Sequence, residues 1–234
     1  WAHGHPKHHS NEDDGQIGCV LNSLYNRDPM SHGHINFTRC GLPIDVQKRI
    51  GEKFWGSPDT VDAIGDYTPT NIYKMKRLQW VVARKELHDM LGICSWTAPW
   101  EVSPLREKGY IGDIEMESKV FRAVTGIEMT QDDLDKAGLR AFILQRLYTM
   151  RQLKSRNPRQ DHDQYPEWIF WDPKGKAPFT KGTIRMERSD IEKSFDLFYG
   201  LMDFDVKTGA PTEKSLKEYG LDFALPTMKQ EGLM

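Results

Sequence analysis

Cysteine is scarce in this sequence, and so are long apolar runs, strand patterns and net charge. The 234 residues include three cysteines, and the formal net charge is −2 at pH 7. An odd number of widely spaced cysteines argues against a disulfide framework and for a reducing compartment. A nearly neutral chain offers no basic face for nucleic acid or an anionic membrane, and no apolar run is long enough to cross a bilayer. We therefore expect a soluble cytoplasmic protein that binds neither nucleic acid nor membrane.

The N-terminal segment, residues 1–45, is rich in Gly, His, Asn, Asp and Pro and has little periodicity. This composition predicts irregular loops with short elements, and a long irregular segment typically lines a site or packs on another domain. The chain opens at Trp1 without a clear start of an element, so we expect it to be the later part of a larger polypeptide. We divide it into an irregular, site-lining segment at 1–45 and a helical domain at 46–234.

Apolar residues at helical spacing dominate the second part. They predict a helix that ends near Leu91, where Gly92 offers a stop, and a shorter one closed by Gly126. Thr130 with Asp133 resembles a capping box that opens the most strongly predicted helix, with apolar residues from Leu134 to Leu153.

Two further helices are predicted towards the C-terminus. Ser189 with Glu192 predicts a capping box, and Thr212 caps a last short helix closed at Gly220. Credible strands are limited to three short stretches, FTRCGLP, EWIFW and GTIRM. The predicted fold class is therefore mainly α and multihelical.

The stretch HDMLGICSW, residues 88–96, places an acid, a glycine and a cysteine at the end of a predicted helix. A thiolate is a soft ligand for iron or zinc, but an iron–sulfur cluster normally needs four. Cys19 and Cys40 lie far upstream without CxxC spacing, so further ligands for Cys94 would come from other polypeptide. Asp89 could accept hydrogen bonds from an amine-rich ring, and Gly92 lets the backbone approach a bound group. The alternative is that Cys94 is a small buried hydrophobic residue.

DMLGIC closely resembles the DxxGLC motif of the aldehyde ferredoxin oxidoreductase family, with Ile93 in place of the usual leucine. These enzymes hold tungsten or molybdenum between two pterin cofactors beside a four-iron cluster. The resemblance continues through residues 60–221, in AVTGIEMTQDDLDKAGLRAFILQRLYTMRQ, DHDQYPEW and LFYGLMDFDVKTGAPTEKSLKEYGL. The sequence departs from the family pattern at Tyr148, Met202, Asp203 and Phe204.

A weaker resemblance lies upstream, in SLYNRDPMSHGHINF. It is similar to a family stretch whose histidine lies near the metal, and its NRDxMxH pattern is closer to the branch with the tungsten benzoyl-coenzyme A reductase subunit. Arg27 matches the family's arginine. His32 is the first counterpart of the histidine and His34 the second.

The resemblance implies roles for the motif. Cys94 would be the last of four cluster ligands, the others lying in a CxxCxxxC motif that this chain does not contain. Asp89 would hydrogen-bond a pterin with the Ile93 backbone beside it, and His32 would donate or accept a proton near the metal. The fold implied is that of the family's helical second and third domains.

The resemblance also implies an activity. Aldehydes would be oxidised to carboxylic acids with ferredoxin, or a small ferredoxin-like subunit, as electron acceptor. The benzoyl-coenzyme A branch implies thioester reduction instead. This chain would be inactive without the N-terminal cofactor domain.

Other signals have simpler interpretations. The histidines at positions 3, 5, 8 and 9 could bind zinc, which would suit a non-catalytic helical module, but a polar loop explains them as well. His88 is interpreted as a solvated helix residue. The segment 161–163 (Asp-His-Asp) could serve acid–base chemistry, although the resemblance makes it a structural turn. Three arginines of the longest helix are expected to form ion pairs or to touch a cofactor phosphate, namely Arg140, Arg146 and Arg151.

Overall fold

The computed structural model describes residues 15–25, 41–63, 67–94, 100–165 and 187–234. Within these ranges the regular elements are helices, so the mainly α fold class is confirmed. The stretches EWIFW and GTIRM lie outside the described residues. FTRCGLP does so in part, and its last three residues are irregular and lead into a helix.

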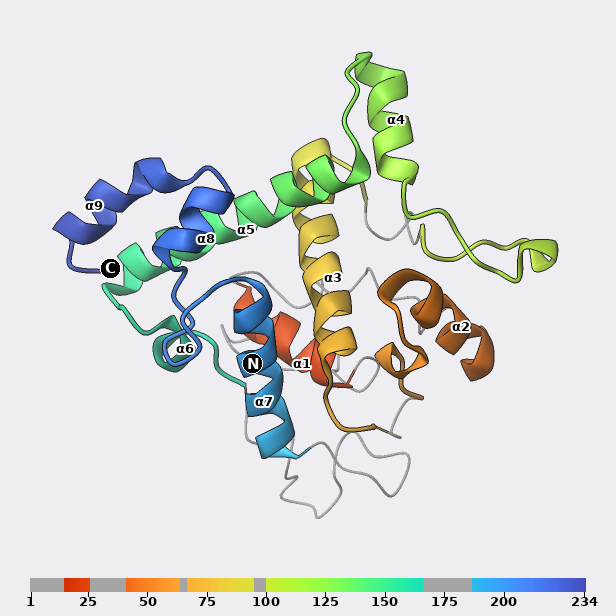
Figure 1. The fold of residues 1–234 in the computed structure, drawn as a ribbon, viewed down its shortest axis with the longest axis horizontal. Coiled ribbons are helices and arrows are strands. Elements are labelled where there is room, and N and C mark those ends of the chain that lie inside the picture. Colours follow the sequence, from red (N-terminus) through yellow and green to blue (C-terminus); the bar gives the residue numbers. More distant parts are fainter. Residues whose placement is uncertain (1–14, 26–40, 64–66, 95–99, 166–186) are drawn as a thin grey trace.

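Two long helices, α3 (Ile72–Leu91) and α5 (Gln131–Leu153), cross at the centre of the molecule (Figure 1). The Asn71 side chain caps α3, and the predicted capping box of Thr130 and Asp133 opens α5. The crossing is very close, because a Cβ added at Gly138 would lie 2.1 Å from the carbonyl oxygen of Ala83. Gly138 therefore lets the two backbones touch.

The main core forms where α1 (Gly15–Leu24) and α7 (Arg188–Leu201) pack against α3. All ten residues of α1 are buried, so the segment 1–45 is not irregular throughout. The predicted capping box of Ser189 and Glu192 is wrong. Helix α7 starts at Arg188 after Glu187, no side chain caps it, and Ser189 lies inside the first turn.

A second, smaller core lies between α2 (Ile44–Trp55), the 3-10 helix η5 (Pro58–Thr60) and residues 100–112. Residues 100–112 fold back on themselves around the 3-10 helix η7 (Arg106–Lys108). The Ser103 N–H donates to the Tyr110 carbonyl at 2.8 Å, and the Gly112 N–H to the Glu101 carbonyl at 3.0 Å. This segment closes over α2 and α3.

The remaining helices are short. Helix α4 (Met116–Thr125) ends at Gly126 as predicted, and α6 is Pro158–Asp161. Thr212 caps α8 (Glu213–Glu218) as predicted. It is not the last helix, because η9 (Asp222–Ala224) and α9 (Leu225–Gln230) follow and lie beside the C-terminal half of α5 (Figure 1).

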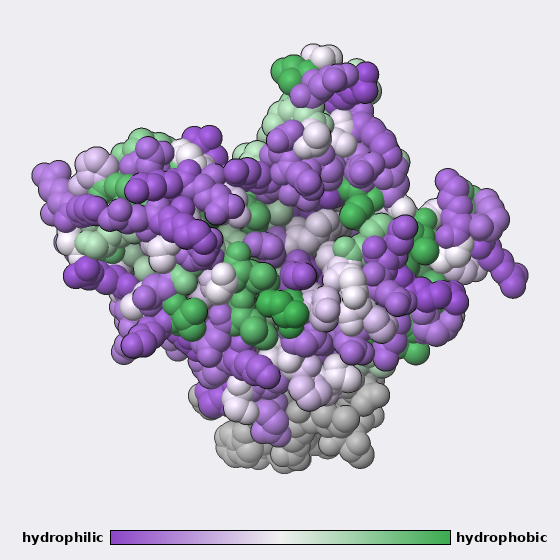
Figure 2. Space-filling view, in the orientation of Figure 1, coloured by the Kyte–Doolittle hydropathy of each residue, from purple (hydrophilic) through white to green (hydrophobic). Residues whose placement is uncertain are grey.

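The face shown in Figure 2 is mostly hydrophilic, with hydrophobic residues in small separate patches. Among the described helices, none is both long enough and apolar enough to cross a membrane.

Candidate functional site

The DMLGIC motif forms a tight turn at the C-terminal end of α3. Gly92 has a φ of 69°, which favours glycine, and its N–H donates to the His88 carbonyl. The Ile93 N–H donates to the same carbonyl at 2.9 Å. A Cβ added at Gly92 would meet no described residue within 4 Å, so this side of the turn is not covered by the described part of the chain. The turn therefore combines a fixed backbone with an accessible surface.

The side chains of the motif reach this surface. Asp89 is one-third exposed and pairs with the Lys85 ammonium at 2.5 Å, while Ile93 is half-buried. Cys94 is exposed, so its interpretation as a small buried hydrophobic residue is wrong. That description fits Cys19 instead, because it is fully buried and its burial raises the pKa of the thiol far above the ordinary range.

His88 is buried, which corrects its interpretation as a solvated residue. Its Nε2 lies 3.0 Å from the Glu117 carboxylate of α4, and both side chains are 1% exposed. The His88 backbone carbonyl holds the motif turn, as described above. A single residue thus links the turn to a helix that follows it in the chain.

Arg84 extends this link to α5. Its Nη1 donates to Glu117 at 2.7 Å, its Nε donates to Asp135 at 2.6 Å, and its Nη2 donates to the Ile114 carbonyl at 2.7 Å. The guanidinium also stacks on Trp80, 5.0 Å from the ring centroid. A buried charge is costly unless it is paired and hydrogen-bonded, so these bonds fix the positions of α3, α4 and α5 relative to one another.

Two glutamates near the motif have unusual electrostatics. Burial raises the pKa of Glu86 to about 7, and the negative charge of Asp89 adds to the shift. Burial also raises the pKa of Glu101 to about 7, against the lowering effects of its own backbone N–H and of Arg77 and Arg84. Both carboxyl groups are therefore close to half-protonated at neutral pH.

Several predicted site residues lie outside the described residues: Arg27, His32, His34, Cys40 and the histidines at positions 3, 5, 8 and 9. Within the described ranges, no three His, Cys, Asp or Glu side chains lie close enough together to hold a metal ion. Of the predicted site, the structure therefore brings together Asp89, Gly92, Ile93 and Cys94.

A second buried polar cluster lies at the other end of α5. Arg146 donates to the Asp163 carboxylate at 3.0 Å, and His162 and Tyr199 also bond this carboxylate. Burial opposes ionisation of Asp163, but Arg146 and His162 lower its pKa overall. The ion pairs expected of Arg146 and Arg151 are confirmed: the pair of Arg146 with Asp163 is buried, whereas Arg151 pairs with Glu231 at the surface. With every member bonded, the cluster fits the structural role expected for residues 161–163.

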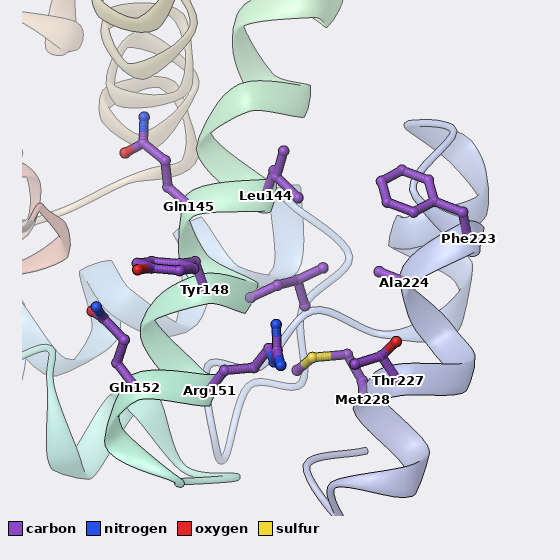
Figure 3. Close-up of a pocket in the computed structure, with 10 residues that line it drawn as sticks. Leu144, Gln145, Tyr148, Arg151, Gln152, Phe223, Ala224, Thr227 and Met228 are labelled. Carbon is purple, nitrogen blue, oxygen red and sulfur yellow. The ribbon is translucent and has the colours of Figure 1, made fainter.

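A cavity in the described part of the chain is separate from the motif. It is an open, mostly apolar groove of about 650 Å³ between the C-terminal half of α5 and α9 (Figure 3). Leu144 of α5 lies on the side toward Phe223, the Met228 side chain points toward α5, and the Tyr148 ring points away from α9. It contains none of the motif residues, so the candidate site is the turn after α3 and not this groove.

A family model described as "Aldehyde ferredoxin oxidoreductase, domains 2 & 3" matches residues 32–221. This range includes the α3 turn, its buried anchors, and both His32 and His34. The chain belongs to the aldehyde ferredoxin oxidoreductase family, a family of oxidoreductases with pterin-bound tungsten or molybdenum.

The motif could be predicted from the sequence, but the buried acids that anchor it could not. Glu117, Asp135 and Glu101 carry no local pattern that distinguishes them from surface acids. The one available signal is that Glu117 lies in the first turn of a predicted helix, which does not predict its burial.

Proposed function

We propose that this chain is the C-terminal part of a tungsten or molybdenum bis-pterin, iron–sulfur oxidoreductase that oxidises aldehydes to carboxylic acids. The observation that carries the proposal is the turn of Asp89, Gly92, Ile93 and Cys94 in a chain of this family. Its Cys94 is exposed, and the buried contact of His88 with Glu117 holds it in place. When bound, the metal and cluster supply the oxidation of the aldehyde carbon and the passage of electrons to the acceptor.

The residues present fit these cofactors. The open side of Gly92 leaves room for a group to approach the backbone, and the Cys94 thiol is accessible as a soft ligand. Because the described residues contain no cluster of three further ligands, Cys94 suits the role of a single ligand completed by other polypeptide.

Each motif residue has a distinct task. Asp89 accepts hydrogen bonds from the amine groups of a pterin, and Lys85 orients its carboxylate. Gly92 and Ile93 present backbone at close range. Cys94 binds the cluster. Because one turn carries all four, two redox groups would be held at the same end of α3.

The proton chemistry is assigned by resemblance to residues outside the described ranges. His32, with His34 as the second candidate, donates or accepts a proton near the metal, since imidazole titrates near neutral pH. Arg27 occupies the position of the family's arginine beside them. Variants of His32 and His34 distinguish the two histidines.

The partners follow from the same proposal. The matched description covers domains 2 and 3, which supports a further cofactor-binding domain of the same enzyme as the supplier of the remaining three cysteines. Ferredoxin, or a small ferredoxin-like iron–sulfur subunit, accepts the electrons.

Metal analysis and turnover of the native enzyme, purified without oxygen, test the proposal. Tungsten or molybdenum with about four iron atoms per protomer, together with aldehyde-dependent reduction of ferredoxin, is the expected result. Reduction of an aryl or acyl thioester without aldehyde oxidation would favour the benzoyl-coenzyme A type instead. Zinc alone, or no metal, would favour a non-catalytic helical module and reject the proposal.

A further inference from the structure

Glu101 is a buried acid for which the proposed roles give no use. Its side chain is 0% exposed, and neither carboxylate oxygen accepts a hydrogen bond from another described residue. Buried carboxylates are nearly always hydrogen-bonded, because an unmet buried charge is expensive. A carboxyl group in such a place persists either as a structural defect or because its proton is used.

The backbone around Glu101 fixes its position firmly. The Gly112 N–H donates to the Glu101 carbonyl, and the Asp113 N–H donates to the Trp100 carbonyl at 2.7 Å. A Cβ added at Gly112 would lie 1.9 Å from the Trp100 carbonyl oxygen, so the backbone at residues 100–101 packs directly against the backbone at Gly112. These backbone hydrogen bonds fix the position of residue 101, and its carboxylate is influenced by the N–H of its own backbone.

The charges that face Glu101 come from two helices. Arg77 and Arg84 of α3 favour its ionised form, and Glu117 of α4 opposes it. Both arginines are otherwise engaged: Arg77 donates to the Thr60 carbonyl at 3.1 Å and stacks on Trp55, and Arg84 is bonded to Glu117 and Asp135. Burial outweighs the attraction and raises the pKa of Glu101 to about 7, so a further negative charge nearby favours the protonated form at neutral pH.

The same groups connect Glu101 to the motif turn. The negative charge of Glu117 raises the pKa of Glu101, and Glu117 also bonds His88, whose backbone carbonyl accepts the N–H groups of Gly92 and Ile93. An electron placed at the turn adds negative charge at one end of this series of contacts, in which His88 and Glu117 are buried. Charge added there raises the proton affinity of Glu101, and by linkage a proton on Glu101 favours gain of the electron.

We propose that Glu101 is a redox-linked proton site: its carboxylate takes one proton from solvent when the iron–sulfur group bound by Cys94 gains one electron, and releases it when that electron leaves. The electron comes from the aldehyde and passes on to the acceptor, so charge balances at each stage. Glu117 does not serve this purpose, because its oxygens are bonded to His88 and Arg84. This inference rests on the proposed function.

The test is the reduction potential of the cluster against pH, followed by electron paramagnetic resonance in the native enzyme. In the wild type the reduction equilibrium changes up to tenfold per pH unit above about pH 7, equal to about 59 mV for one electron. In Glu101→Gln the potential becomes independent of pH. Glu115→Gln, an exposed acid at the start of α4, keeps the wild-type slope.

Retention of the slope in Glu101→Gln overturns the inference while the cluster signal itself upholds the proposed function. Loss of the slope in Glu86→Gln alone would assign the proton to Glu86 and also overturn it. If no cluster is present in the wild type, both the inference and the proposed function fail.

A second measurement uses the wild type and does not depend on a folded variant. The redox-difference infrared spectrum is expected to contain the C=O band of a protonated carboxylic acid that appears on reduction and shifts with 13C-glutamate labelling. Absence of that band contradicts the inference.

Discussion

At the scale of single residues, the candidate site depends on acids that are buried far from their own segment of chain. Glu117 is 1% exposed and bonds His88 and Arg84 at once. The Glu117→Gln variant keeps the shape but removes the charge that Arg84 and His88 face. Because breaking a buried pair leaves an uncompensated charge, we expect a loss of roughly 3 kcal/mol in the free energy of unfolding.

Urea unfolding of the purified chain measures this loss. The matched control is Glu128→Gln, which removes an exposed pair with Arg122 and is expected to cost less than about 1 kcal/mol. Equal losses in the two variants would show that the His88–Glu117 contact does not stabilise the chain.

Glu101 leads to a prediction about how the free energy of unfolding depends on pH. Its pKa is raised from the ordinary value of 4.5 to about 7 in the folded chain, so folding favours the protonated form. The stability that it contributes is fully present below about pH 4.5 and is lost as pH rises through about 7. Relative to Glu101→Gln, the wild type is therefore expected to lose roughly 3 kcal/mol between about pH 5 and pH 8.

The measurement is the free energy of unfolding of both proteins across that pH range. Glu86 contributes equally to both curves, so the difference isolates Glu101. Parallel curves would mean that the buried carboxyl group is not protonated by folding.

At the scale of elements, the crossing of α3 and α5 allows a test of packing. Gly138→Ala would force a Cβ to within 2.1 Å of the Ala83 carbonyl, so the helices must separate. We expect a loss of roughly 1–3 kcal/mol. Gly200→Ala, in helix α7 with open space around it, is expected to stabilise by roughly 0.5–1 kcal/mol through helix propensity. The measurement is the thermal unfolding temperature of each variant relative to the wild type. A shift of both temperatures in the same direction would contradict the close crossing of α3 and α5.

The elements also show what sequence could predict. The ends of α3 and α4 and the start of α5 follow from local chemistry, since Gly92, Gly126 and the Thr130–Asp133 box each act within one turn. Helix α1 was missed because its buried face covers the whole helix, which leaves no polar side to reveal a period. The Ser189–Glu192 box was wrong because sequence spacing alone did not place the helix start.

At the site, the turn of Asp89 to Cys94 could be predicted because its chemistry lies in six consecutive residues. The burial of His88 and Glu101 could not, since it depends on segments that meet only after folding. The role of the Lys85–Asp89 ion pair also could not be predicted, because it depends on where the turn lies.

At the scale of the whole molecule, the motif lies toward one end of α5 and the groove between α5 and α9 lies toward the other (Figures 1 and 3). The buried clusters around Arg84 and Arg146 hold the two ends separately. The motif turn is therefore anchored by the buried His88–Glu117 contact on its inner side and exposed at Cys94 on its outer side.

The most direct test of this account is the cluster signal of the native enzyme in two matched cysteine variants. Cys94→Ala is expected to abolish the four-iron electron paramagnetic resonance signal and to lower the bound iron, while Cys19→Ala, at a buried thiol, retains both. An unchanged signal and iron content in Cys94→Ala would contradict the assignment of the α3 turn as a cofactor site.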